Sequence, residues 1–173
     1  MDLTGTGEMT STESISMDYN GKLHTLSRAE LWLGRTILGE WVKELGTVTE
    51  FLQSEMKAEK VSIDGTREAG LAGLFLAALD GNIDRIILRE APVTYLFDSR
   101  ENINFYSMAI HLPGFLQWGD VSLAAALSGK DVTFTDPLTM SGNKLNDLRL
   151  KAHQDEYNKI RGLCRTKGRT IFN

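Results

Sequence analysis

A tight turn from Gly65 to Gly70 holds the side chains whose types and spacing best suit chemistry. It follows a short strand that contains Val61 and Ile63, and it precedes a helix that is apolar almost all the way round, over residues 71–79. A strand, a sharp turn and a buried helix in this order expose a nucleophile at the tip of the turn. The residue at the tip is Arg67, and a guanidinium that stays protonated in proteins cannot act as a nucleophile. The sequence therefore predicts the backbone of a catalytic turn without its reacting atom.

Two carboxylates are placed where they could take part in catalysis, and each also has a structural explanation. Glu68 follows Arg67 directly, but neighbouring Arg and Glu residues more often form a surface ion pair of small value, which is the interpretation we favour. Asp136 precedes Pro137 after a predicted strand. It is a weak candidate for a catalytic acid, and we favour a role as a turn or helix cap. Arg67, at the N-terminus of the predicted helix, is also a candidate to bind an anion such as a carboxylate.

Neither a metal nor a cofactor is expected. The three histidines, His24, His111 and His153, lie in separate segments without close spacing to one another, so a metal site would require a coincidence of the fold. We expect His24 in a loop, His111 packed or hydrogen-bonded, and His153 on the exposed side of a helix. The single cysteine, Cys164, excludes an intramolecular disulfide.

The composition is that of an ordinary globular protein. The chain has 173 residues, 42% of them hydrophobic and 24% charged, with a formal net charge of −4. These values fit one domain with a real core, and they argue against nucleic acid and an anionic membrane as partners. We interpret the basic residues over 159–169 as the solvated end of a helix. No apolar run approaches the roughly 18 residues that span a bilayer. We expect a soluble protein with no export signal in this chain. If the chain is part of a longer parent protein, that protein could be secreted or periplasmic.

Residues 1–26 are expected to form an irregular N-terminal arm and residues 27–173 a single domain. Ser27 and Glu30 make a capping box that predicts a helix start. The apolar stripe of that helix continues to residue 52. Its internal glycines predict either close packing against a sheet or a break near Gly46.

Further along, predicted strands alternate with predicted helices. Ile86, Ile87 and Leu88 in succession indicate a strand buried on both faces. Asp120 is expected to cap a short helix. Beyond it the pattern predicts a strand over 130–136, a long helix over 145–163 and the start of a strand over 170–172. This order predicts an α/β protein, a three-layer α/β/α fold with a mostly parallel sheet.

Four stretches carry a family resemblance. They are DLTGTGE at 2–8, LGRTILG at 33–39, GLFLAALDGNID at 73–84, and residues 113–126. In order and spacing they are similar to the C-terminal two-thirds of α/β-hydrolases of the acetyl xylan esterase or cephalosporin deacetylase group. The resemblance implies a partial α/β-hydrolase-like fold.

The resemblance also implies where a catalytic triad belongs. Arg67 stands where the family has its serine. The acid is expected nearest Thr139, so Asp136 lies three residues early. The histidine is expected after a further strand, and the sequence ends at Asn173 where that strand begins. No triad role is filled in its expected place.

The same resemblance places the 60–65 strand at the centre of a larger sheet. Without the preceding strands, its edge presents unpaired backbone groups that favour pairing with another chain. We therefore expect self-association through the 60–65 edge, or an origin within a larger polypeptide.

Two functions remain open from the sequence. The preferred one is a non-catalytic α/β-hydrolase-like module, a degenerate or truncated carbohydrate-esterase relative with a structural or ligand-binding role. The alternative is a serine-esterase-type hydrolase of acetylated carbohydrate or small esters, completed by another chain or a missing segment. Arg67 favours the first function. A truncated chain could lack the histidine base, but truncation does not explain why an arginine stands where the nucleophilic serine is expected.

Overall fold

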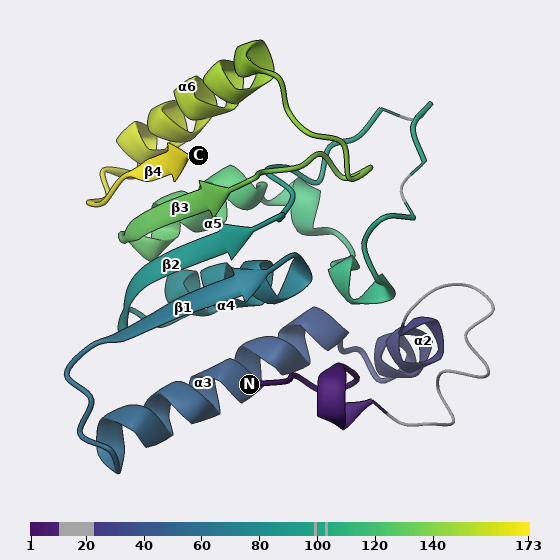
Figure 1. Cartoon of the computed structure of the whole chain (residues 1–173), viewed down its shortest axis with the longest axis vertical. Helices are drawn as coiled ribbons and strands as arrows, with labels where there is room; N and C mark the ends of the chain where they lie inside the picture. The colour runs from purple at the N-terminus through teal and green to yellow at the C-terminus, as the bar shows by residue number, and fades with distance from the viewer. Residues whose placement is uncertain (11–22, 99, 103) are drawn as a thin grey trace.

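A computed structural model describes residues 1–10, 23–98, 100–102 and 104–173. Helices and strands alternate from α3 onward (Figure 1). In chain order the elements are η1 (Gly7–Met9), α2 (His24–Trp32), α3 (Ile37–Ser54), β1 (Val61–Thr66), α4 (Glu68–Leu79), β2 (Ile83–Arg89), η2 (Met108–Ile110), η3 (Phe115–Gln117), α5 (Val121–Ser128), β3 (Asp131–Thr135), α6 (Asp147–Cys164) and β4 (Thr170–Phe172).

The strands form one sheet in the order β1-β2-β3-β4, and every neighbouring pair is parallel. The predicted fold class is confirmed. Helices pack on a four-stranded, all-parallel sheet, as an α/β fold with a parallel sheet requires. Asp120 caps α5 as predicted, since its carboxylate accepts a hydrogen bond from the Val121 N–H at 2.7 Å.

The crossovers determine where the helices lie. Strand order follows chain order, so the connections through α4, α5 and α6 all step in one direction. Because parallel crossovers are right-handed, these helices fall on the same side of the sheet, and Figure 1 shows α4 and α5 behind the strands. Helix α3 packs along α4, and α6 packs along α5 and β4.

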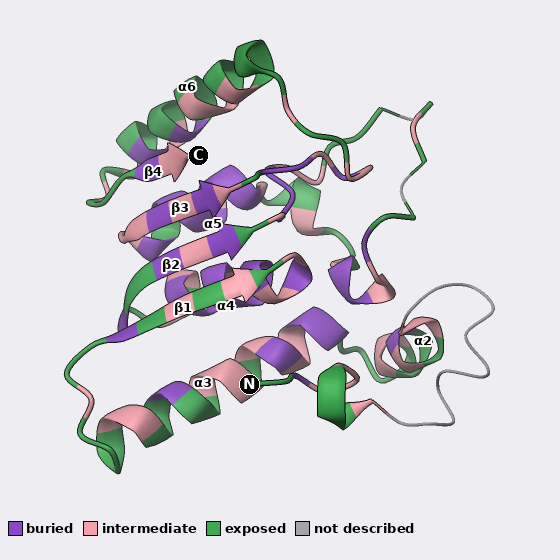
Figure 2. Cartoon of the chain, in the orientation of Figure 1, coloured by how far each residue is buried: buried purple, intermediate pink, exposed green. Residues whose placement is uncertain are grey.

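The core lies between this row of helices and the facing side of the sheet (Figure 2). Its fully buried side chains include Leu71, Leu74, Ile86, Leu88, Val132 and Phe134, each 0% exposed. Burial of each such side chain stabilises the fold by about 1.5–3 kcal/mol.

The other side of the sheet is polar and more exposed. Aligned residues of parallel strands share a face, and Asp64, Ile87 and Thr133 are aligned across β1, β2 and β3. Asp64 is exposed, and Ile87 and Thr133 are intermediate. The prediction that residues 86–88 are buried on both faces is therefore wrong for Ile87, because the helices described above lie on the opposite side.

The first long helix differs from its prediction. Helix α2 begins at His24, and the Ser27 N–H bonds to the Leu23 carbonyl oxygen at 2.8 Å within it. Ser27 is not a cap. It is buried, and its hydroxyl donates to the Met108 carbonyl oxygen at 3.2 Å. The helix then ends before Gly34, which has φ +73°.

A second helix starts after this break. The Thr36 hydroxyl caps α3 by accepting a hydrogen bond from the Gly39 N–H at 3.0 Å. Gly46 lies inside α3, and a Cβ added there would meet the Leu76 side chain of α4 at 3.5 Å. The close-packing alternative for Gly46 is therefore right, with a helix rather than the sheet as the neighbour.

Residues 1–10 lie against α3 rather than standing free. Leu3 is 5% exposed, and the Trp41 indole N–H donates to the Thr4 carbonyl oxygen at 2.9 Å. The Thr4 N–H donates to Glu44 at 3.0 Å. The part of the expected irregular arm over residues 11–22 lies outside the described residues.

Within the described ranges, no helix is both long and apolar enough to cross a membrane.

Candidate functional site

The turn between β1 and α4 has a strained backbone, and Arg67 occupies its tip. Arg67 has φ 55° and ψ −126°. Its N–H donates to the Arg89 carbonyl oxygen of β2 at 2.7 Å, and its carbonyl oxygen accepts from the Gly70 N–H at 3.1 Å. Such a conformation costs about 1–3 kcal/mol in a residue other than glycine. Strain of this kind is typical of the strand-to-helix turn that exposes a catalytic serine.

Two glycines allow the strand and the helix to approach closely enough for this turn. A Cβ added to Gly65 would lie 2.7 Å from the Gly70 Cα, and one added to Gly70 would lie 2.7 Å from the Gly65 carbonyl oxygen. Both distances are too short for real atoms. The sequence signal of a glycine-bounded turn therefore corresponds to a physical contact.

The Arg67 side chain is engaged by groups of the same chain. Its Nε donates to a Glu90 carboxylate oxygen at 3.2 Å. Its guanidinium carbon lies 4.6 Å from the centroid of the Phe105 ring. The side chains of Arg67 and Glu90 are 42% and 47% exposed. The tip of the turn thus carries a neutralised, half-exposed cation.

Glu90 and Phe105 were not among the residues predicted for the site. Glu90 follows β2 directly. Because the carboxyl ends of parallel strands meet at one edge of a sheet, its place near Arg67 could have been predicted from the sequence. Phe105 lies in the irregular segment between β2 and α5, which has no periodic pattern that places it over the turn.

Glu68 does not form the surface ion pair that we favoured from the sequence, so that interpretation is wrong. It is 7% exposed, and its carboxylate accepts a hydrogen bond from the Ser107 N–H. The Arg67 cation pairs with Glu90 instead. Burial raises the pKa of Tyr106, and the nearby Glu68 carboxylate raises this pKa further. Glu68 therefore fastens the segment around residue 107 to the start of α4.

Three charged residues repeat one backbone arrangement at the carboxyl edge of the sheet. Arg67, Glu90 and Asp136 directly follow β1, β2 and β3, with φ of 55°, 50° and 47°. Each N–H donates to a carbonyl oxygen on the next strand or at its end, over 2.7, 3.0 and 3.0 Å. The first two also form an ion pair with one another.

Neither acid position forms a contact suited to catalysis. The Asp136 side chain is 64% exposed and lies 3.7 Å from the Lys144 ammonium. The Thr139 hydroxyl accepts hydrogen bonds from the N–H groups of Ser141 and Asn143 at 3.3 and 3.1 Å, which closes a local turn. Both residues are therefore used in holding loops.

The positions of His24 and His153 differ from the expectations. His24 is the first residue of α2 rather than part of a loop. His111 directly follows η2 and is exposed, and its backbone N–H donates to the Met108 carbonyl oxygen at 3.4 Å, so it is hydrogen-bonded rather than packed. His153 is only 20% exposed, and its Nδ1 lies 3.6 Å from a Glu156 carboxylate oxygen. Across the residues that the structure describes, no group of three or more His, Cys, Asp or Glu side chains is placed to hold a metal ion.

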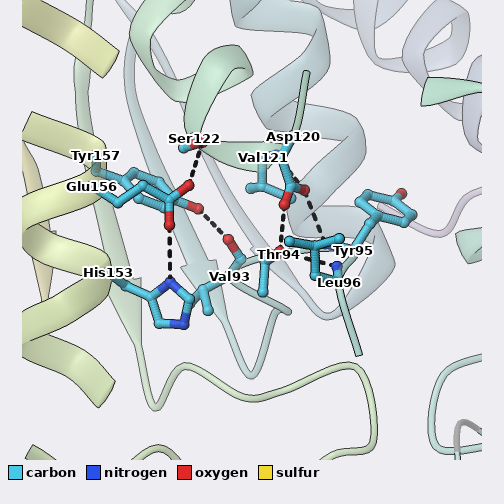
Figure 3. Close-up of polar contacts among 10 residues, drawn as sticks. All are labelled: Val93, Thr94, Tyr95, Leu96, Asp120, Val121, Ser122, His153, Glu156 and Tyr157. Carbon is cyan, nitrogen blue, oxygen red and sulfur yellow. Dashed lines mark hydrogen bonds and ion pairs between the residues drawn. The ribbon is translucent and has the colours of Figure 1, made fainter. Parts of the chain in front are cut away.

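A separate cleft of about 320 Å³ lies between α6 and the segment that follows β2. His153 projects from α6 toward Val93, and the Glu156 carboxylate lies between His153 and Ser122 (Figure 3). The Ser122 hydroxyl donates to the Glu156 carboxylate at 3.1 Å. The three residue types of a hydrolase triad meet here, but the carboxylate lies between the other two, so the imidazole does not contact the hydroxyl as a general base must.

The walls of this cleft are fixed by buried polar contacts (Figure 3). The Tyr157 hydroxyl donates to the Val93 carbonyl oxygen at 2.6 Å. Asp120 accepts hydrogen bonds from the Tyr95 N–H at 2.9 Å and from the Thr94 hydroxyl. Burial raises the pKa of Tyr157 well above its ordinary value, so this hydroxyl stays a donor at neutral pH.

Comparison of the chain with protein-family models, with curated proteins and with solved structures found no significant match.

Proposed function

We propose that this chain is a non-catalytic α/β-hydrolase-like module, a degenerate or truncated relative of carbohydrate esterases with a structural or ligand-binding role. The observation that carries the proposal is the residue at the tip of the strained turn. A cation that cannot lose its proton at physiological pH occupies the position from which a nucleophile would attack.

The surroundings of Arg67 support the same proposal. An esterase turn must leave room for the substrate carbonyl and must present a base to the nucleophile. Here Glu90 and Phe105 occupy two sides of the guanidinium. The nearest buried carboxylate, Glu68, is used by a backbone N–H of another segment.

The ligand-binding part of the proposal rests on Arg67. Its Nε is taken by Glu90, and no hydrogen bond from its two terminal nitrogens is present among the described residues. A carboxylate ligand would compete with Glu90 for this cation. Calorimetric titration with acetate or a uronate tests this role, and an absence of heat would dismiss it.

The partner proposed for the module is a second copy or a further part of a larger polypeptide at β1. This strand pairs only with β2 in the described part of the chain, and its other edge runs beside α3. Backbone groups at such an edge favour pairing with another strand. Sedimentation over a range of concentrations tests self-association, and a compact monomer at high concentration would exclude it.

An acyl ester assay tests the absence of catalysis. The purified chain is incubated with p-nitrophenyl acetate beside the variants Glu68→Gln and Asp136→Asn. We expect all three proteins to match the hydrolysis rate of the heat-denatured chain. Turnover by the parent chain that either substitution abolishes would overturn the proposal in favour of an active esterase.

A further inference from the structure

The first half of α6 turns a stripe of mixed charge toward the cleft described above. Arg149, Ala152, His153 and Glu156 all line this cleft. Their spacing of three, four and seven residues places them on one face of the helix. At a rise of 1.5 Å per residue, Arg149 and Glu156 stand about 10 Å apart along the helix axis.

The two ends of this stripe offer opposite charges with different degrees of constraint. One oxygen of Glu156 is held by the Ser122 hydroxyl at 3.1 Å, and the other lies 3.6 Å from the His153 imidazole. The Arg149 guanidinium makes no ion pair or hydrogen bond among the described residues, although its charge helps to lower the pKa of Asp98 after the larger effect of Arg100. Arg149 thus presents a free fork of donors, and Glu156 presents a fixed carboxylate.

The surface between these charges is mainly apolar. Val93, Leu145 and Ala152 line this part of the cleft, and Leu145 is partly buried against the core. Thr94, Asp98, Glu101 and Thr139 also line the cleft, and a cleft of this size that combines apolar surface with charged groups has the dimensions of a small-molecule site.

We propose that this cleft binds an ω-amino carboxylate, a small molecule with a methylene chain between a carboxylate and an ammonium group. The carboxylate pairs with the Arg149 fork, the geometry in which arginine recognises carboxylates best. The ammonium pairs with Glu156, and the methylene chain lies over Val93, Leu145 and Ala152. The site uses no group of the Arg67 turn, so the proposal does not depend on the proposed function.

Isothermal titration of the full chain with 6-aminohexanoate, hexanoate and hexylamine tests both ends of the site. Hexanoate lacks the ammonium group and hexylamine lacks the carboxylate. We expect 6-aminohexanoate to bind at least about tenfold more tightly than either, which corresponds to about 1.4 kcal/mol. Equal affinity for the three compounds, or no binding of 6-aminohexanoate, would overturn the proposal.

Variants assign the two ends. Arg149→Gln and Glu156→Gln should each reduce the affinity for 6-aminohexanoate about tenfold, and Arg149→Gln should leave hexylamine binding unchanged. Lys159→Gln, on an exposed position of α6 outside the cleft, is the matched control and should change nothing. Circular dichroism confirms that each variant is folded. Full affinity in both glutamine variants would place the ligand elsewhere and refute the assignment.

Discussion

The guanidinium carbon of Arg67 lies 4.6 Å from the centroid of the Phe105 ring, on the strained turn that joins β1 to α4. A cation over an aromatic face at a partly exposed site stabilises by about 0.5–1 kcal/mol, and the ion pair with Glu90 adds at most about 1 kcal/mol. The strained backbone of Arg67 costs about 1–3 kcal/mol. The side-chain contacts are therefore of the same size as the strain, and the close contact between Gly65 and Gly70 also holds the turn.

Replacing Arg67 separates backbone strain from side-chain contacts. Arg67→Gly relieves the strain, whereas Arg67→Ala keeps it, and both lose the contacts with Glu90 and Phe105. We expect the glycine variant to be more stable than the alanine variant by about 1–2 kcal/mol in urea unfolding. Lys43 is an exposed helical position of α3. There the alanine variant should be more stable than the glycine variant by about 1 kcal/mol. If the alanine variant is more stable than the glycine variant at Arg67 as well as at Lys43, the turn is unstrained.

Gly70→Ala should disrupt the turn through a backbone clash. The added Cβ would lie 2.7 Å from the Gly65 carbonyl oxygen, and relief requires β1 and α4 to separate. We expect a loss of about 1–3 kcal/mol in unfolding free energy. Gly162→Ala, in α6 with no atom within 4 Å of its added Cβ, should instead gain up to about 1 kcal/mol. A neutral Gly70→Ala variant would contradict the tight approach.

Arg161→Met should be strongly destabilising because Arg161 serves three acceptors from inside the fold. The side chain is 7% exposed and donates to the carbonyl oxygens of Lys167 and Ala125 at 2.6 and 2.8 Å, and to the Thr170 hydroxyl at 3.1 Å. Loss of these donors removes one of the two hydrogen bonds to the buried Ala125 carbonyl oxygen and the bond from Arg161 to the buried Thr170 hydroxyl, for an expected cost of about 2–4 kcal/mol in thermal or urea unfolding. Lys159→Met, exposed on the same helix, should stay within about 0.5 kcal/mol. Equal effects would argue against a structural role for Arg161.

Acid should weaken the polar face of the sheet through Asp64. Hydrogen bonds from Arg89 hold the pKa of Asp64 below its ordinary value of 3.8. The folded state thus favours the carboxylate, so this contribution is present above pH 3.8 and is lost as the pH falls through the folded-state pKa. Because both side chains are nearly half exposed, the effect should stay below about 1 kcal/mol. Unfolding measured from pH 6 to pH 2 should show a smaller acid loss in Asp64→Asn than in the parent chain. Asp155→Asn, at an exposed site, should follow the parent curve.

The sequence predicted the order of the sheet elements and the turn well, because local signals and packing agree there. Ile86 and Leu88 are buried as their types suggest, and Asp120 caps α5. Gly65 and Gly70 bound a turn that only small residues allow. In these places the pattern and the tertiary contacts impose the same structure.

Prediction failed where a long-range contact decided the outcome. Ser27 resembles a cap, but Met108, far along the chain, takes its hydroxyl. Glu68 resembles a surface acid, but it is buried because a backbone N–H of Ser107 meets it. Arg161 stood among residues interpreted as a solvated helix end, yet acceptors on three other segments surround it. None of these partners is visible in local spacing. The Thr36 cap is the exception, because its spacing to Gly39 was a usable local signal for the break before α3.

The order in which the sheet is laid down has a consequence for synthesis on the ribosome. Each strand pairs with the strand that emerged just before it, and each helix between them docks beside the previous helix. Every newly released unit therefore meets a surface that already exists, and no strand must wait for one made much later. Connections of this local kind shorten the search for native contacts and favour stepwise acquisition of structure from the N-terminal side.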